Sequence, residues 1–190
     1  MSGNSLVEMK NITKKFGIVT ALNEISFKIN RGEVHVLLGE NGAGKSTLMK
    51  ILSGVYQPTS GKIIIGGKDY DYLTPKLSFE NKISIIYQEL SVIDELSIQE
   101  NLFVGKLPIK KVFGVEIVDY KYMEKVTNKL LNKIGLNRNP YTLVEDLTIS
   151  EKQQVEIAKA LASDADVIIM DEPTTSLTES ETNNLFRIIR

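Results

Sequence analysis

The residues most capable of chemistry form a glycine-rich segment, residues 39–46, that fits the pattern G-x-x-x-x-G-K-S/T. Glycines allow the backbone to curl so that successive N–H groups point at phosphate oxygens. Lys45 would reach the outer phosphates of a nucleotide, and the Ser46 hydroxyl would bind Mg²⁺. A turn without a ligand is the alternative. It is disfavoured because an apolar strand, Val34 to Leu38, is expected before the segment and an amphipathic helix, Lys45 to Leu52, after it.

The sequence therefore predicts a phosphate loop that is followed directly by the N-terminus of a helix. Its expected nucleotide contacts are Gly39, Glu40, Asn41, Gly42, Ala43, Gly44, Lys45, Ser46 and Thr47.

Two adjacent carboxylates, Asp171 and Glu172, follow the unbroken apolar run Val167 to Met170. Such a run is typical of a buried strand, and ligands of open α/β sheets bind at the carboxyl ends of strands. Asp171 would hold Mg²⁺ through a water molecule, and Glu172 would polarise the water that attacks a phosphate. Two solvated acids in a loop are the alternative, and a phosphate loop in the same chain makes it the weaker one.

The base bound beside these groups is predicted to be adenine. Guanine-reading loops carry Asn/Thr-Lys-x-Asp, and the Asp is missing after both Asn81-Lys82 and Asn132-Lys133. Phe16, in a Lys-Lys-Phe-Gly turn, could stack on the adenine ring or could belong to the core, and the sequence leaves both open. His35 is the single histidine, and a core position is the expected one for it.

Alternating apolar residues predict further strands over residues 6–9, 25–29, 62–65 and 83–87, with turns at Arg31-Gly32 and Gly66-Gly67. From Ser91 onward the pattern is helical. Helix starts are predicted at the capping boxes Ser97-x-x-Glu100, Ser150-x-x-Gln153 and Thr178-x-x-Glu181, and at Asp119, whose helix would end at Gly135.

Composition excludes several classes of protein. The chain has 190 residues, with 23 Lys+Arg and 24 Asp+Glu, and its formal charge of −1 argues against a general nucleic-acid binder. Cysteine is absent, which excludes disulfides, zinc–thiolate sites and thiol nucleophiles. The apolar runs are far shorter than the roughly 18 residues of a membrane-spanning helix, so membrane contact is expected only through partners.

Taken together, the motifs resemble those of the ATP-binding subunits of ABC transporters, and among these the subunits of monosaccharide importers. The resemblance covers nearly the whole chain, including residues 32–35 before the phosphate loop and residues 171–179. Residues 87–90, Tyr-Gln-Glu-Leu, are similar to the family's glutamine loop. The resemblance implies that Gln88 contacts Mg²⁺ and the attacking water, close to where the transport subunits dock.

The family signature, Leu-Ser-Gly-Gly-Gln, is degraded here to Leu-Thr-Ile-Ser-Glu at residues 147–151. The resemblance implies that Thr148, with Ser150 beside it, faces the γ-phosphate of ATP on a partner molecule. Ile149 and Ser150 replace the two glycines, and the bulk of Ile149 would weaken hydrolysis. Thr178 stands where most of the family has Asp, and sugar importers often have Thr there.

The implied fold is α/β, a P-loop NTPase (RecA-like) core with an antiparallel β subdomain and a helical subdomain insert. Residues 1–88 and 163–190 would form the core and β subdomain, and residues 89–162 the helical subdomain. The whole of residues 1–190 would be a partial first nucleotide-binding domain, because a helical pattern runs to Arg190 without a stop signal and the family's switch histidine is not reached.

By resemblance, the intact protein would bind and hydrolyse ATP to energise sugar import at the cytoplasmic face of the plasma membrane. Its partners would be transmembrane permease subunits and a second nucleotide-binding domain. We expect the chain alone to bind Mg-ATP, to hydrolyse it slowly and to stay largely monomeric. Two alternatives remain: a non-catalytic nucleotide-binding module, and a soluble ABC-type ATPase of DNA repair or translation. A long coiled-coil insertion or basic arm would favour the latter, and the sequence has neither.

Overall fold

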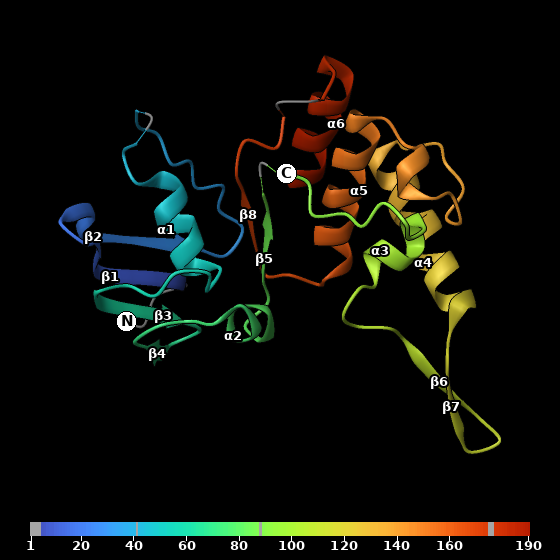
Figure 1. Cartoon of the computed structure of the whole chain (residues 1–190), viewed down its shortest axis with the longest axis horizontal. Helices are drawn as coiled ribbons and strands as arrows, with labels where there is room; N and C mark the ends of the chain where they lie inside the picture. The colour runs from blue at the N-terminus through green and yellow to red at the C-terminus, as the bar shows by residue number, and fades with distance from the viewer. Residues whose placement is uncertain (1–4, 41, 88, 175–176) are drawn as a thin grey trace. The chain divides into compact units, whose positions relative to one another are not determined.

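The computed structural model describes residues 5–40, 42–87, 89–174 and 177–190. The chain divides into two compact units, Met1–Ser84 and Ile85–Arg190, drawn in blue to green and in green to red in Figure 1. Two predicted site residues, Asn41 and Gln88, lie outside the described residues, as do Thr175 and Ser176 of the segment after Glu172.

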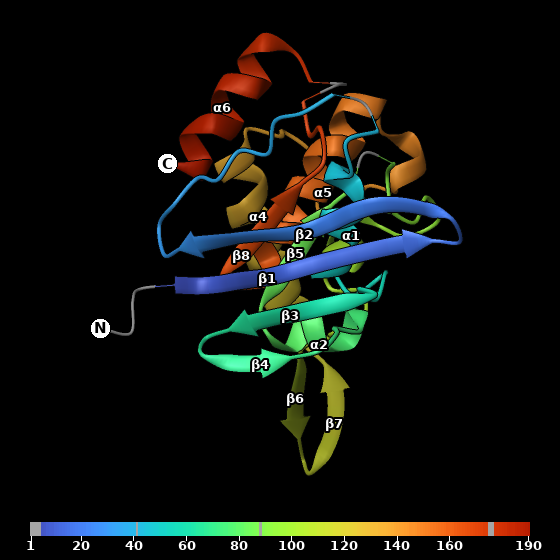
Figure 2. The same ribbon diagram turned by 90° about the vertical axis from the view of Figure 1, so that its left-hand side faces the viewer.

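An antiparallel sheet with the strand order β2-β1-β3-β4 dominates the N-terminal unit (Figure 2). The strands are β1 (Ser5–Phe16), β2 (Val19–Asn30), β3 (Ser60–Ile65) and β4 (Lys68–Tyr70). Val7, Met9 and Ile63 are fully buried, and Met9 lies opposite Ile63 in the ladder. The predicted strands over residues 6–9, 25–29 and 62–65 are confirmed as parts of β1, β2 and β3.

Two helices complete this unit. Helix α1 (Lys45–Leu52) has the predicted bounds and buries Leu48, Ile51 and Leu52. Helix α2 (Pro75–Glu80) was not predicted, although the Thr-Pro pair at its start is a typical helix beginning. The Thr74 side chain caps α2 by accepting from the Leu77 N–H at 3.2 Å.

The predicted strand over residues 34–38 is wrong. The structure assigns no strand there, and Val34, Val36 and Leu38 are 64, 66 and 89% exposed. An apolar run favours burial, but a β-strand forms only where a second strand pairs with its backbone N–H and C=O groups. The core position expected for His35 is wrong too. Its ring stacks on Phe27 with centroids 5.5 Å apart, and the residue is exposed.

Strands β5 (Ile83–Ile86) and β8 (Val167–Met170) pair with each other, as the predicted runs at both positions anticipated. The helices of the C-terminal unit are α3 (Ile98–Leu102), α4 (Tyr120–Ile134), α5 (Ile149–Ala162) and α6 (Glu179–Ile189), with a 3₁₀ turn, η1, at Val144–Asp146. One apolar core, which includes Ile98, Leu131 and Val155, joins them. Within the described ranges, no helix is long and apolar enough to cross a bilayer.

Capping chemistry sets where these helices begin. The boxes Ser97–Glu100 and Thr178–Glu181 are confirmed, as is Asp119 at the start of α4. The predicted box Ser150–Gln153 is wrong, because α5 begins two residues earlier with Thr148 as cap and Glu151 as its partner. The two frames overlap in the sequence. The Glu151 carboxylate is favoured over the neutral Gln153 carboxamide as the partner of the cap, because a negative charge also interacts with the positive end of the helix dipole.

A β-hairpin interrupts the region that was expected to be wholly helical. Strands β6 (Ile109–Val112) and β7 (Val115–Val118) pair with a two-residue turn between them. The turn residues Phe113 and Gly114 have φ values of +49° and +84°, as a hairpin turn of the I′ type requires. Phe is uncommon at such a position, which is why the turn was missed.

The hairpin extends away from the helices of its unit (Figure 1). Its base is closed by a hydrogen bond of 2.8 Å from the Asp119 N–H to the Pro108 carbonyl and by the ion pair of Lys110 with Asp119 at 2.9 Å. The Phe113 side chain at the tip is fully exposed.

The capping carboxylates predict an acid-sensitive C-terminal unit. Hydrogen bonds from Ser97 lower the pKa of Glu100, and a hydrogen bond from Arg138 lowers that of Glu151, below the ordinary value of 4.5. A carboxylate with a lowered pKa stabilises the fold above its unfolded pKa, and this contribution disappears as the pH falls through the folded pKa. We expect the free energy of unfolding to decrease below about pH 4.5. Urea titrations at several pH values test this, and Glu100→Gln should reduce the slope; an unchanged slope would contradict it.

Candidate nucleotide site

The phosphate loop takes a shape that only glycine accommodates at two positions. Gly42 and Gly44 have φ values of +86° and +87°, in the left-handed region. A Cβ on Gly44 would lie 2.6 Å from the Ala21 carbonyl oxygen and 2.7 Å from a Leu22 methyl. The end of the loop therefore packs directly against the start of β2.

Helix α1 begins at this loop without a competing anion. Gly44 is its N-cap and provides no side-chain cap, and its first turn has no acidic residue. Ser46 and Thr47 lie in that first turn, where free N–H groups and the helix dipole favour a bound anion. The Lys45 Nζ donates to the Gly39 carbonyl at 2.6 Å and to the Glu40 carbonyl at 2.9 Å, so the ammonium group is held over its own loop.

Phe16 lies at the same end of the β1–β2 hairpin as Gly44. It pairs with Val19 in the ladder, two residues before Ala21, against which Gly44 packs. Its side chain is 42% exposed, so the alternative that Phe16 is a core residue is wrong. Tyr56 contacts its ring edge-on with centroids 5.3 Å apart, and the Lys14 Nζ lies 4.8 Å from the ring centroid. The ring is thus held in place and remains accessible.

The acidic pair lies in the C-terminal unit, where β8 ends. The Asp171 N–H donates to the Ile86 carbonyl at 3.0 Å, which continues the pairing with β5 up to the first acid. Glu172 follows with φ +50°, an uncommon value for a residue with a side chain. Such backbone strain is found preferentially at functional sites.

Thr148 and Ser150 lie at the start of α5, in the same unit. The Thr148 hydroxyl accepts from the Glu151 N–H at 3.3 Å, and Glu151 Oε2 accepts from the Thr148 N–H at 2.9 Å. Ser150 is inside the helix, and its hydroxyl donates to Glu181 at 2.8 Å. The Ile149 side chain between them is 68% exposed.

A sequence profile of the family described as ABC transporter matches residues 22–175, which include the phosphate loop, the Thr148 segment and the acidic pair. The chain belongs to the ABC transporter family.

Curated relatives within this family carry sugar-import names. The galactose/methyl galactoside import ATP-binding protein of Clostridium tetani is 48% identical over 189 residues, which are 100% of this chain and 38% of the relative. The D-allose import ATP-binding protein of Escherichia coli is 50% identical over 183 residues, 96% of this chain and 36% of the relative. The chain thus spans little more than a third of the length of these relatives.

Solved structures agree on the fold. An ATP-binding cassette of an ABC transporter in its ADP conformation is 26% identical, with a TM-score of 0.81 over 97% of this chain and 75% of that one. A dimeric cassette in a post-hydrolysis state with ADP and Pi is also 26% identical, with a TM-score of 0.81 over 96% of this chain and 81% of that one. This ABC domain therefore has the α/β fold of a P-loop NTPase.

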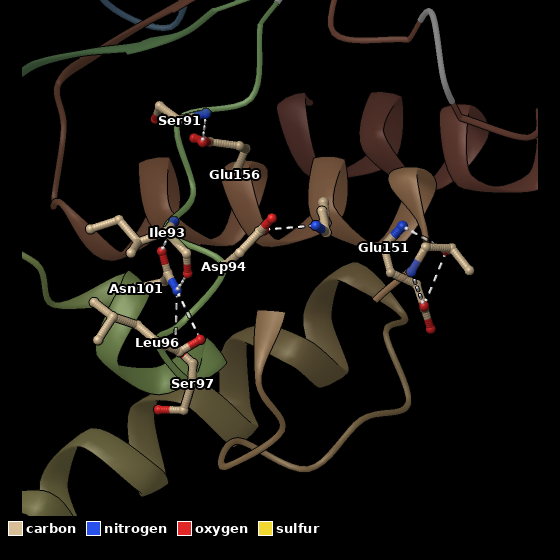
Figure 3. Close-up of polar contacts among 10 residues, drawn as sticks. Ser91, Ile93, Asp94, Leu96, Ser97, Asn101, Glu151 and Glu156 are labelled. Carbon is tan, nitrogen blue, oxygen red and sulfur yellow. Dashed lines mark hydrogen bonds and ion pairs between the residues drawn. The ribbon is translucent and has the colours of Figure 1, made fainter. Parts of the chain in front are cut away.

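The segment after Gln88 is fastened to α5 in this ABC domain (Figure 3). The Glu156 carboxylate, only 4% exposed, accepts from the Ser91 N–H at 2.6 Å. The Lys152 Nζ donates to Asp94 at 2.7 Å. The fully buried carboxamide of Asn101 makes further hydrogen bonds to the backbone of the same segment. Ser91 and Asp94 therefore bind the segment to α5, the helix capped by Thr148, and Asn101 binds it to α3.

Sequence reasoning missed two residues that support this region. Arg138 makes a bidentate ion pair with Glu151 at 2.7 and 3.2 Å. Glu181, which was predicted only as a cap for α6, also accepts a hydrogen bond from the Ser150 hydroxyl of α5. Both contacts join residues far apart in the chain, so no local spacing could have revealed them. The structure places the phosphate loop and Phe16 in the N-terminal unit, and Asp171, Glu172, Thr148 and Ser150 in the C-terminal unit.

Proposed function

We propose that this chain is the ATP-binding part of a sugar importer, and that the whole protein hydrolyses ATP to drive import. The observation that carries this is the phosphate loop, with left-handed Gly42 and Gly44 and the uncapped start of α1. Sugar import in particular is supported by the names of the galactose and allose relatives.

Each site residue receives a role in this proposal. Lys45 binds the outer phosphates, and the N–H groups from Gly39 to Thr47 surround them. Phe16 stacks on adenine. The Ser46 hydroxyl, Asp171 and the phosphates would hold Mg²⁺, since all three supply the oxygen donors that this ion prefers. When bound, the ion neutralises charge on the transferred phosphoryl group.

Turnover requires groups beyond those for binding. We assign Glu172 as the base that polarises the attacking water, with Gln88 as a further contact to Mg²⁺ and that water. Thr148 and Ser150 would face the ATP of a second nucleotide-binding domain, either in the same chain or in a dimer. The dimeric cassette with ADP and Pi supports such a pairing.

Permease subunits would dock on the segment from Asp94 to Glu100 at the cytoplasmic face of the membrane. The ion pair of Asp94 with Lys152 of α5 supports this, as does the hydrogen bond of the preceding Ser91 to Glu156, because a displacement of the segment would move the helix that begins after Thr148. We also propose that residues 1–88 and 163–190 form the core with the β subdomain, and residues 89–162 the helical subdomain.

A second candidate, a module that binds ATP without hydrolysing it, is favoured by one observation. The Thr148 hydroxyl is engaged in the capping box of α5. Ile149 is exposed where the family has glycine, so its side chain leaves less space than glycine would for a partner's phosphate to approach the backbone.

Titration calorimetry and steady-state turnover separate the two candidates. We expect this chain to bind Mg-ATP more tightly than Mg-GTP, and the full-length protein with its permease to hydrolyse ATP. Binding without turnover in the full-length protein would identify the second candidate. Absence of Mg-ATP binding to folded protein, verified by circular dichroism, would contradict both.

A further inference from the structure

One carboxylate in the C-terminal unit serves two helices at once. Glu181 Oε2 accepts from the Thr178 N–H and the Thr178 hydroxyl, each at 2.8 Å, and so caps α6. The same oxygen accepts from the Ser150 hydroxyl of α5 at 2.8 Å, and Glu181 Oε1 accepts from the Gln154 carboxamide. The starts of α5 and α6 are therefore joined through a single side chain.

The other two capping boxes of the unit lack this arrangement. Glu100 is bound by Ser97 of its own box, and Glu151 takes its additional bonds from Arg138, which precedes α5 in a loop. Capping α6 would need only Thr178 and Glu181. The two donors from α5 are additional, which indicates a purpose beyond starting a helix.

The Glu181 bridge, meaning the hydrogen bonds of Glu181 to Ser150, Gln154 and Thr178, is partly shielded from solvent. Gln154 is 5% exposed and Glu181 is partly buried. Burial raises the pKa of Glu181, but the hydrogen bonds from Thr178, Ser150 and Gln154 outweigh it, so the net pKa is lowered. The side chain is therefore charged at neutral pH, and hydrogen bonds to a charged group are the stronger ones.

The bridge connects two segments with separate roles in the proposed function. Ser150 is two residues after Thr148, which would face the ATP of the partner domain. Thr178 ends the segment that begins at Asp171 and Glu172, which would act on this domain's own ATP. A shift at one ATP site would therefore be passed to the other through Ser150, Glu181 and Thr178.

We propose that Glu181 is a positioning residue that couples the two ATP sites of the paired domains, by holding the start of α5 to Thr178 at the start of α6. The proposal rests on the function proposed above. It assigns no contact with nucleotide to Glu181, and it explains why the Ser150 hydroxyl is directed toward α6.

The test removes the donors of the bridge one at a time in the full-length protein with its permease. Ser150→Ala and Gln154→Met each delete one donor and leave both capping boxes intact. We expect each to lower kcat about threefold to tenfold, the size of one hydrogen bond, with KM changed less than twofold. The double variant should lose no more than the stronger single variant, because both act through Glu181.

One further variant, at a residue outside the proposed site, is the control for these. Ser163→Ala deletes a hydroxyl at the other end of α5, which donates to the Ala160 carbonyl at 2.7 Å, and should leave kcat unchanged. Wild-type kcat in both single variants, additive losses in the double variant, or an equal loss in Ser163→Ala would overturn the proposal.

Hydrogen exchange gives a readout that does not depend on turnover. In Ser150→Ala, the amides of residues 178–182, which form the N-cap and first turn of α6, should exchange faster, although the substitution is on α5. Unchanged exchange there would also overturn the coupling. If these amides exchanged faster in Ser150→Ala but the wild-type protein showed no ATP turnover, the proposed function would be wrong while the link between α5 and α6 through Glu181 would be supported.

Discussion

Replacing Lys45 with alanine should weaken Mg-ATP binding by roughly 1.5–3 kcal/mol, which is about tenfold to 150-fold in Kd. The phosphate loop supplies backbone N–H groups, but Lys45 is the full positive charge that the structure places on it. Its ammonium group lies against the carbonyls of Gly39 and Glu40 and would have to exchange these oxygens for phosphate oxygens. The substitution removes a charge-assisted contact, and the uncharged backbone N–H groups of the loop cannot replace it.

Calorimetric titration measures this loss, and Lys62→Ala is its matched control. Lys62 is a lysine of the same unit, on β3, whose Nζ lies 3.7 Å from Asp69. We expect its removal to leave the ATP affinity unchanged. Equal affinities for the wild type and Lys45→Ala, with both folded, would show that the loop does not bind phosphate as proposed.

The Glu172→Gln substitution should keep ATP bound and lower this site's turnover by about 10²–10⁴-fold, as expected when a general base is removed. Gln has the shape of Glu and can take the same left-handed backbone at φ +50°, but it cannot accept a proton. Asp171, which is assigned to Mg²⁺, is unchanged, so the affinity for Mg-ATP should persist.

This experiment uses the full-length protein with any second site disabled, so that the remaining hydrolysis belongs to Glu172. Glu179→Gln is the control, since Glu179 is an exposed acid of the first turn of α6. Full activity in Glu172→Gln would assign the base elsewhere. Equal losses in both variants would indicate a general effect of negative charge on this segment.

The parts of the fold that depend on neighbouring residues could be predicted from sequence. Strand β8 and helix α1 have the predicted bounds, because the spacing of apolar residues that determines burial there is a property of consecutive residues. The start of α5 was misplaced because two capping frames overlap, and only the geometry of Thr148 and Glu151 distinguishes them.

Features that depend on distant residues could not be predicted. Residues 34–38 have the composition of a strand, but a strand forms only if another segment pairs with it, and these residues alone do not show whether such a segment exists. The link between Ser150 and Glu181 spans 31 residues of sequence, so spacing alone gave Ser150 only a local role. At the site, the phosphate loop follows from residue types, whereas the exposure of Phe16 needed the fold.

The closed base of the β6–β7 hairpin has a consequence for how sequences of this kind can vary. Because Asp119 is bonded to Pro108 at 2.8 Å, the chain leaves and re-enters the helical unit at almost the same point. The number of residues in the β6–β7 hairpin therefore does not affect where α4 begins. Insertions or deletions at Phe113 and Gly114 would lengthen or shorten a ribbon without moving any helix, which makes the tip the natural place for length differences to accumulate.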